Sequence, residues 1–115
     1  VKDARILLLG ITFKENCPDI RNTKIVDIYS TLREYTSNIT VYDPWADKAH
    51  VEHEYGIGIS KGDMESLEGK FDAVIFGVAH NEFKDLDARA FLKAENGVVY
   101  DVKGILPKNQ IDGRL

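Results

Sequence analysis

Apolar residues fall into four short, continuous runs separated by polar stretches. A run without apolar–polar alternation is typical of a strand buried on both faces, as in a parallel sheet. We therefore predict four main strands, at residues 5–10, 39–43, 71–79 and 98–102. A minor strand is expected at residues 57–60, in a stretch interrupted by Gly56 and Gly58.

Helical spacing appears between these runs. The first helix is predicted from one apolar stripe, formed by Ile25, Val26, Ile28, Tyr29 and Leu32. Asn22 or Thr23 is expected to cap its start. Residues 47–55 fit a short, weak helix, and residues 63–67 a further helical turn. Another helix is expected at residues 87–95, with Ala88, Phe91 and Leu92 facing inward and Asn96-Gly97 as its stop signal.

Alternating strands and helices predict βαβ units with right-handed crossovers. The expected fold class is α/β: a Rossmann-like, doubly wound, mainly parallel sheet with helices on both faces, formed by residues 1–115 as a single domain. Ligands of such sheets sit beyond the carboxyl ends of the strands. Those ends fall at residues 10–14, 43–44, 79–80 and 101–104, and all four are expected along one edge.

A glycine after the first strand raises the question of dinucleotide binding. The glycine fingerprint G-x-G-x-x-G is absent, because the residues from Gly10 onward read Gly-Ile-Thr-Phe-Lys-Glu. Asp43 ends the second strand, where an acid would hold a ribose, but without the glycines the favoured interpretation is that it caps the segment after Pro44. The sequence thus predicts a Rossmann-like layout without its own NAD-binding loop.

The stretch between the first strand and the first helix is longer than the usual ~2–6 residues of such a connection. Lys14 suits phosphate or carboxylate oxygens, and Arg21 offers a planar fork for phosphate. Phe13 is suited either to stacking on a ring or to filling the core. On spacing alone, the favoured alternative is that both cations are solvated, with Asp19 pairing one of them.

Composition limits the function classes. The chain has 115 residues, 43% apolar and 30% charged, which is typical of one globular domain. A net charge of −4 disfavours a nucleic-acid binder, and no apolar run approaches the ~18 residues that span a membrane. A single cysteine, Cys17, fits a reducing, cytoplasmic compartment. The first residue is not Met, which we take as a hint of a longer parent protein.

Three motifs resemble the C-terminal domain of the UDP-glucose/GDP-mannose dehydrogenase family. The family pattern G-x-x-F-K, four variable residues, D-x-R matches residues 10–21, its Y-D-P strand end matches residues 42–44, and its later D-x-R/K element resembles residues 101–103. The resemblance covers nearly the whole chain. The residues at 16–23 and 42–47 are most similar to the bacterial and archaeal UDP-N-acetylhexosamine dehydrogenases, which make uronic acid sugars for surface polysaccharides.

The resemblance implies roles for individual residues. Phe13 and Lys14 match the pair that contacts the sugar nucleotide, and Arg21 matches the arginine that reaches the NAD held by the N-terminal domain. Lys103 stands where many members have an arginine that contacts the UDP part, and a lysine there lacks the fork geometry. Cys17 does not match the family's catalytic cysteine, which belongs to a preceding domain.

The resemblance also implies the setting of the domain. Family members oxidise the sugar C6 alcohol to a carboxylate in two hydride transfers with two NAD, and they are commonly dimers or larger. The expected partners of this chain are a UDP-sugar and the N-terminal and central domains of the same enzyme. The isolated fragment is expected to be inactive and to hold no catalytic residue. We expect the positive side chains of residues 10–21 and 101–104 to form a single anion-receiving rim.

Other readings remain open at this point. A non-catalytic α/β binding module, or a module for interdomain or oligomer contacts, would need no ligand rim. A receiver-like domain is disfavoured, because glycine, phenylalanine and lysine stand where an acidic cluster is needed. His50 and His53 have helical spacing but lack convergent ligands, so no metal site is predicted. His80 is expected to cap a turn rather than to touch ligand, and Trp45 to lie in the core or at an interdomain contact.

Overall fold

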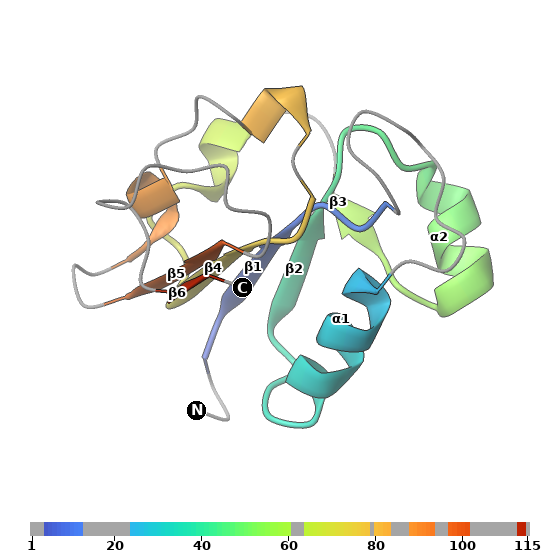
Figure 1. Cartoon of the computed structure of the whole chain (residues 1–115), viewed down its shortest axis with the longest axis horizontal. Coiled ribbons are helices and arrows are strands. Elements are labelled where there is room, and N and C mark those ends of the chain that lie inside the picture. The colour runs from blue at the N-terminus through green and yellow to red at the C-terminus, as the bar shows by residue number, and fades with distance from the viewer. Residues whose placement is uncertain are drawn as a thin grey trace.

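A computed structural model describes residues 4–12, 24–60, 64–78, 80–83, 88–93, 97–101 and 113–114. Its centre is a sheet of six strands, all paired in parallel, in the order β3-β2-β1-β4-β5-β6 (Figure 1). The strands are β1 (Ile6–Leu9), β2 (Ile39–Tyr42), β3 (Ile59–Ser60), β4 (Ala73–Phe76), β5 (Val98–Asp101) and β6 (Gly113–Arg114). The predicted Rossmann-like α/β class is confirmed.

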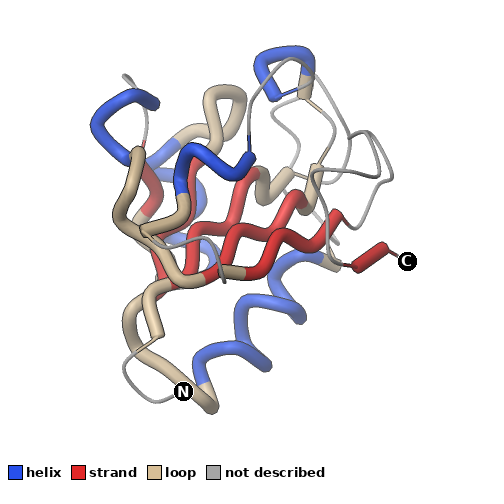
Figure 2. Tube along the Cα trace, turned by 90° about the vertical axis from the view of Figure 1, so that its left-hand side faces the viewer, coloured by secondary structure: helices blue, strands red, loops and turns tan. Residues whose placement is uncertain are grey.

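The sheet places the ends of its central strands at one level. Leu9 pairs with Tyr42 on one side and with Phe76 on the other, and Phe76 pairs with Asp101. The strands lie side by side across the middle of the molecule, with α1 below them in Figure 2. Chain order reverses at β1, since β2 lies on one side of it and β4 on the other. This arrangement confirms the shared carboxyl edge and puts the switch point between β1 and β4.

Two α-helices cover one face of the sheet (Figure 1). They are α1 (Ile25–Arg33) and α2 (Lys48–Tyr55), and both were predicted. The side chain of Asp47 accepts a hydrogen bond from the backbone N–H of His50 at the start of α2, and Gly56 ends that helix with φ 68°. Lys24, not Asn22 or Thr23, occupies the N-cap of α1, without a side-chain cap bond. Asn22 and Thr23 lie outside the described residues.

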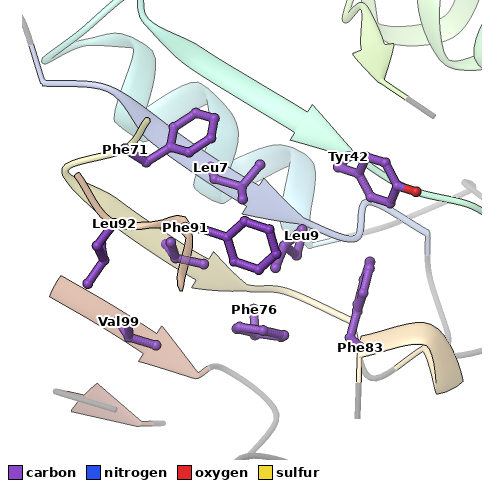
Figure 3. Packing of buried hydrophobic residues seen from close by; sticks show 10 residues of the cluster. Leu7, Leu9, Tyr42, Phe71, Phe76, Phe83, Phe91, Leu92 and Val99 are labelled. Carbon is purple, nitrogen blue, oxygen red and sulfur yellow. The ribbon is translucent and has the colours of Figure 1, made fainter. Parts of the chain in front are cut away.

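The two sides of the sheet have separate cores, which follow from the alternation of side chains along β1. Leu8 packs with α1 and α2, in a cluster that includes Ile25, Val41 and Val51. Leu7 and Leu9 point to the other side. There the core is rich in aromatic side chains (Figure 3). Among the described residues, this side is closed by the short 3-10 helices Met64–Leu67, Asn81–Phe83 and Ala88–Phe91 and by no α-helix.

The predicted helix at residues 87–95 is wrong in type. Its described part is the 3-10 helix Ala88–Phe91, after which Leu92 forms a parallel bridge with Phe71. The backbone N–H of Phe71 donates to the carbonyl of Phe91 at 3.0 Å, and Lys93 N–H donates to the carbonyl of Phe71 at 2.8 Å. These peptide groups bond to a neighbouring segment, so they do not continue a helix. No strand was predicted after residue 102, so β6 was missed.

Candidate functional site

A buried carboxylate stands at the carboxyl edge of the sheet. Asp43 follows β2 directly and is fully buried. Its Oδ1 accepts hydrogen bonds from the backbone N–H groups of Trp45 at 2.7 Å and Ala46 at 2.9 Å. Its Oδ2 accepts from the backbone N–H groups of Ile11 at 2.7 Å and Thr12 at 3.3 Å. The first pair confirms that Asp43 caps the segment after Pro44, and the second ties the exit of β1 to the exit of β2.

His80, which follows β4, contacts the same carboxylate, so the chain segments after β1, β2 and β4 meet at Asp43. Nε2 of His80 lies 3.0 Å from Asp43 Oδ2 and 3.2 Å from Thr12 Oγ1, and all three side chains are fully buried. Burial alone would raise the pKa of Asp43, but the hydrogen bond from His80 and those from the backbone of Ile11 and Trp45 outweigh it, so the pKa lies below its ordinary value of 3.8. Asp43 is therefore a carboxylate at neutral pH, and His80 Nε2 carries the hydrogen that it donates.

Aromatic rings surround the imidazole. The ring of Trp45 stacks on His80 with centroids 6.2 Å apart, and Phe83 meets the imidazole edge-on at 5.4 Å. Trp45 donates its indole N–H to Glu82 Oε1 at 2.9 Å and remains 37% exposed. Trp45 thus packs on the buried His80 while part of its own surface remains exposed.

The expectation for His80 is half right. Its backbone carbonyl accepts from Phe83 N–H at 2.9 Å and so closes the predicted turn. Its side chain also crosses to Asp43 and Thr12, which was not expected. The sequence missed this pairing, although both residues had been placed at strand ends on the same edge.

Close backbone packing explains the glycine that ends β1. Gly10 has φ 95°, and a Cβ built on it would lie 2.6 Å from the Cβ of Val78. A Cβ on Gly77 would approach the carbonyl oxygen of Gly10 to 3.0 Å. Gly10 is therefore required by the tight approach of the β1 and β4 exits at the switch point. This role differs from that of a glycine in a phosphate-binding fingerprint.

The residues predicted to bind ligand, Phe13, Lys14, Arg21 and Lys103, lie outside the described residues, as does Cys17. Their roles stay predictions. The structure describes what borders them: Thr12 directly precedes Phe13, and β5 ends at Asp101, two residues before Lys103. Both borders lie on the carboxyl edge. The anion-receiving rim is thus compatible with the strand ends but is not tested by them.

The described residues were also compared with the requirements of a metal site and of a membrane-spanning helix, neither of which the sequence predicts. Within the described ranges, no three His, Cys, Asp or Glu side chains gather as a metal ion would need, and His50 pairs only loosely with Glu54, at 3.9 Å on the surface of α2. The helices in the described part of the chain are too short or too polar to cross a membrane.

Two described residues of the edge, Asp43 and Gly10, do not have the setting that NAD binding would require of them. An acid at the end of β2 would need a free oxygen for the ribose, yet both oxygens of Asp43 already accept bonds inside the fold. Gly10 is occupied by packing against Val78. At Asp43 and Gly10, the described part of the edge therefore lacks the free acid and the open glycine turn of a dinucleotide-binding loop.

Comparison with known proteins agrees with this layout. Residues 7–108 match the UDP binding domain of the UDP-glucose/GDP-mannose dehydrogenase family. The chain is 48% identical to a UDP-N-acetyl-D-glucosamine 6-dehydrogenase of Pseudomonas aeruginosa and 44% identical to one of Salmonella typhi, over its whole length and 27% of theirs. It thus spans about a quarter of these relatives.

A solved structure shows the same fold. The NDP-N-acetyl-D-galactosaminuronic acid dehydrogenase of Methanosarcina mazei Go1 superposes with a TM-score of 0.79 at 19% identity, over 97% of this chain and 25% of that one. At this identity the likeness concerns the fold alone. Because the family match extends over most of the sequence, the chain belongs to the UDP-glucose/GDP-mannose dehydrogenase family and corresponds to its UDP binding domain.

Proposed function

We propose that this chain is the UDP-sugar-binding domain of an NAD-dependent nucleotide-sugar 6-dehydrogenase. The whole enzyme would oxidise the C6 alcohol of a UDP-N-acetylhexosamine to a carboxylate, for surface polysaccharide synthesis. The observation that carries the proposal is the match to the UDP binding domain over residues 7–108. The 48% identity to a UDP-N-acetyl-D-glucosamine 6-dehydrogenase favours an N-acetylated sugar.

The domain would contribute binding and orientation rather than bond-making. Lys14 and Lys103 would neutralise the pyrophosphate, and Phe13 would complete the sugar-nucleotide contact. Arg21 would reach across to the NAD held mainly by the N-terminal domain. Fixed cations at a partly closed site stabilise phosphate charge more strongly than solvent does, and they hold the reacting carbon in place. Hydride acceptance would belong to the cofactor, and covalent catalysis to other domains of the whole enzyme.

The setting of the domain follows from its share of the relatives. Because the chain spans 27% of their length, the proposal includes N-terminal and central domains in the same polypeptide. The family resemblance adds that the whole enzyme would be a cytoplasmic dimer or larger oligomer. The isolated chain would be inactive. The partly exposed face of Trp45 is the described feature that suits an interdomain contact at this edge.

Steady-state kinetics of the full-length enzyme test the proposal. Lys14→Ala should raise the KM for the UDP-sugar by roughly 10- to 100-fold, as expected for one lost charge-assisted hydrogen bond. Lys70→Ala is the matched control, because Lys70 is an exposed lysine just before β4, at the opposite edge of the sheet. Equal kinetic constants for the Lys14 variant, the control and the parent enzyme would refute the binding role.

A further inference from the structure

The carboxyl edge contains a buried junction that no ligand role accounts for. Three segments far apart in the sequence meet at one carboxylate: Asp43 after β2, the backbone of Ile11 and Thr12 after β1, and His80 after β4. These are the exits of three neighbouring strands, in the sheet order β2-β1-β4. The junction therefore fixes how the chain leaves the switch point of the sheet.

We propose that Asp43 and His80 are positioning residues for the sugar-nucleotide loop, acting through the backbone of Ile11 and Thr12. The inference rests on the proposed function, in which Phe13 and Lys14 contact the UDP-sugar. It adds two residues that do not touch the substrate but determine where that contact is made.

The first step of the argument is covalent proximity. Thr12 is bonded directly to Phe13, and only one further peptide link leads to Lys14. The backbone N–H groups of Ile11 and Thr12 are held by Asp43 Oδ2, and the Thr12 hydroxyl lies beside His80 Nε2. The direction in which the chain approaches Phe13 is set at this point. A displacement of about 1 Å in a substrate-positioning group can cost on the order of 10²-fold in rate.

The second step concerns what Asp43 is able to do. Its carboxylate accepts five hydrogen bonds, four from backbone N–H groups and one from the imidazole. The side chain is fully buried, so it has neither a free oxygen nor an exposed surface for a ligand. Asp43 therefore acts on the ligand site only through the segments that it holds, unlike the ribose-binding acid at the corresponding place in dinucleotide-binding folds.

The third step explains the histidine. A buried carboxylate is unfavourable unless it is paired, and the hydrogen bond from His80 is the largest influence that lowers the pKa of Asp43 against burial. Stacking against Trp45 and edge contact with Phe83 hold the imidazole plane in the direction of that bond. His80 thus keeps Asp43 ionised and fixes the exit of β4 to the same point as the exit of β1.

Asp43→Asn is the direct test in the full-length enzyme. An asparagine has one oxygen and one NH2 group, whereas Asp43 faces backbone donors on both sides. With the oxygen toward Trp45 and Ala46, the NH2 group opposes the N–H groups of Ile11 and Thr12. We expect the KM for the UDP-sugar to rise about 10-fold or more, with a smaller change in the KM for NAD.

A double-mutant cycle separates positioning from loss of stability. If Asp43 acts through the loop, Asp43→Asn should raise the KM much less in a Lys14→Ala background than in the parent, so the two effects will not multiply. Asp47→Ala is the matched control, because Asp47 also caps backbone N–H but holds α2 rather than the exit of β1. It should lower the melting temperature and leave the KM unchanged.

His80 provides a second, milder variant in case Asp43→Asn does not fold. His80→Gln retains a donor toward Asp43 and should keep the KM within about threefold of the parent, whereas His80→Leu, without a donor, should raise it about 10-fold. If Asp43→Asn and His80→Leu lower only the melting temperature while Lys14→Ala still raises the KM, the positioning role is overturned and the proposed function stands. If Lys14→Ala itself has no effect, the proposed function fails.

Discussion

Replacing Gly10 by alanine tests the close packing at the switch point. Gly10 has φ 95°, and the added Cβ would lie 2.6 Å from Val78 Cβ and 2.9 Å from Val78 N. A left-handed backbone costs a non-glycine residue about 1–2 kcal/mol. Overpacking a rigid contact costs a further ~1–3 kcal/mol. The sum, about 2–5 kcal/mol, corresponds to a fall in melting temperature of roughly 8–20 °C for a chain of this size.

Gly56→Ala is the matched control for this prediction. Gly56 also has a positive φ, 68°, but nothing lies within 4 Å of the Cβ that would be added. Only the backbone term applies, so the expected cost is about 1 kcal/mol. Urea unfolding of both variants, with the slope checked to be unchanged, gives the two free energies. Equal losses for Gly10→Ala and Gly56→Ala would show that the contact with Val78 yields without cost, and the argument from close packing would be wrong.

Stability in acid depends on Asp43. Because the pKa of Asp43 in the fold lies below 3.8, the stability that its carboxylate contributes is complete above about pH 3.8 and is lost as the pH falls through the folded-state pKa. In urea unfolding across pH 2–5, the free energy of unfolding should therefore fall less steeply with decreasing pH for Asp43→Asn than for the parent. Asp47→Ala removes the cap of α2 and should cost about 1 kcal/mol, while Asp47→Ser should be nearly neutral by the same assay. Phe83→Ala empties a fully buried aromatic site and should cost about 3–5 kcal/mol; a loss under about 1 kcal/mol in urea unfolding would contradict the packing.

Much of the sheet could be predicted because burial on both faces leaves a plain signal. Continuous apolar runs gave β1, β2, β4 and β5, and the parallel arrangement followed from the helices between them. Strand β3 was expected from a shorter run between turns. Strand β6 has only two residues, Gly113 and Arg114, with no apolar pattern. β6 is defined by its pairing with β5, a contact between segments distant in the sequence that a local pattern does not predict.

The helix expected at residues 87–95 failed for a related reason. Phe91 and Leu92 are adjacent and both buried. A short apolar pair of this kind occurs in buried helices and in buried extended segments alike, so the pattern does not distinguish the two. The conformation of this segment is determined by Phe71, whose backbone groups form hydrogen bonds with Phe91 and Lys93. Gly97 completes this packing, since a Cβ there would lie 2.6 Å from the Leu92 side chain. Phe71 lies about twenty residues before Phe91 and Lys93 in the sequence, so these bonds cannot be predicted from a local window.

The site was predictable in position but not in detail. The rule for strand ends placed Gly10, Asp43 and His80 on one edge, and the structure agrees. Their mutual contacts could not be predicted without the strand order. Thr12 and His80 reach the same carboxylate because β2, β1 and β4 are neighbours in the sheet. Charge and motif predicted ligand roles for loop residues, whereas burial determined the role of Asp43.

Position in a fold therefore does not settle the function of an acid at the end of β2. Where a glycine loop leaves the carboxylate facing an open crevice, that acid can bind a ribose hydroxyl. Here the close approach of Gly10 to Val78 brings the ends of β1 and β4 together. Asp43 Oδ2 then accepts hydrogen bonds from His80 and from two backbone N–H groups. The acid then stabilises the strand exits and has no oxygen left for a ligand. An Asp43→Asn variant with weakened UDP-sugar binding would thus report a displaced loop, not a lost ligand contact.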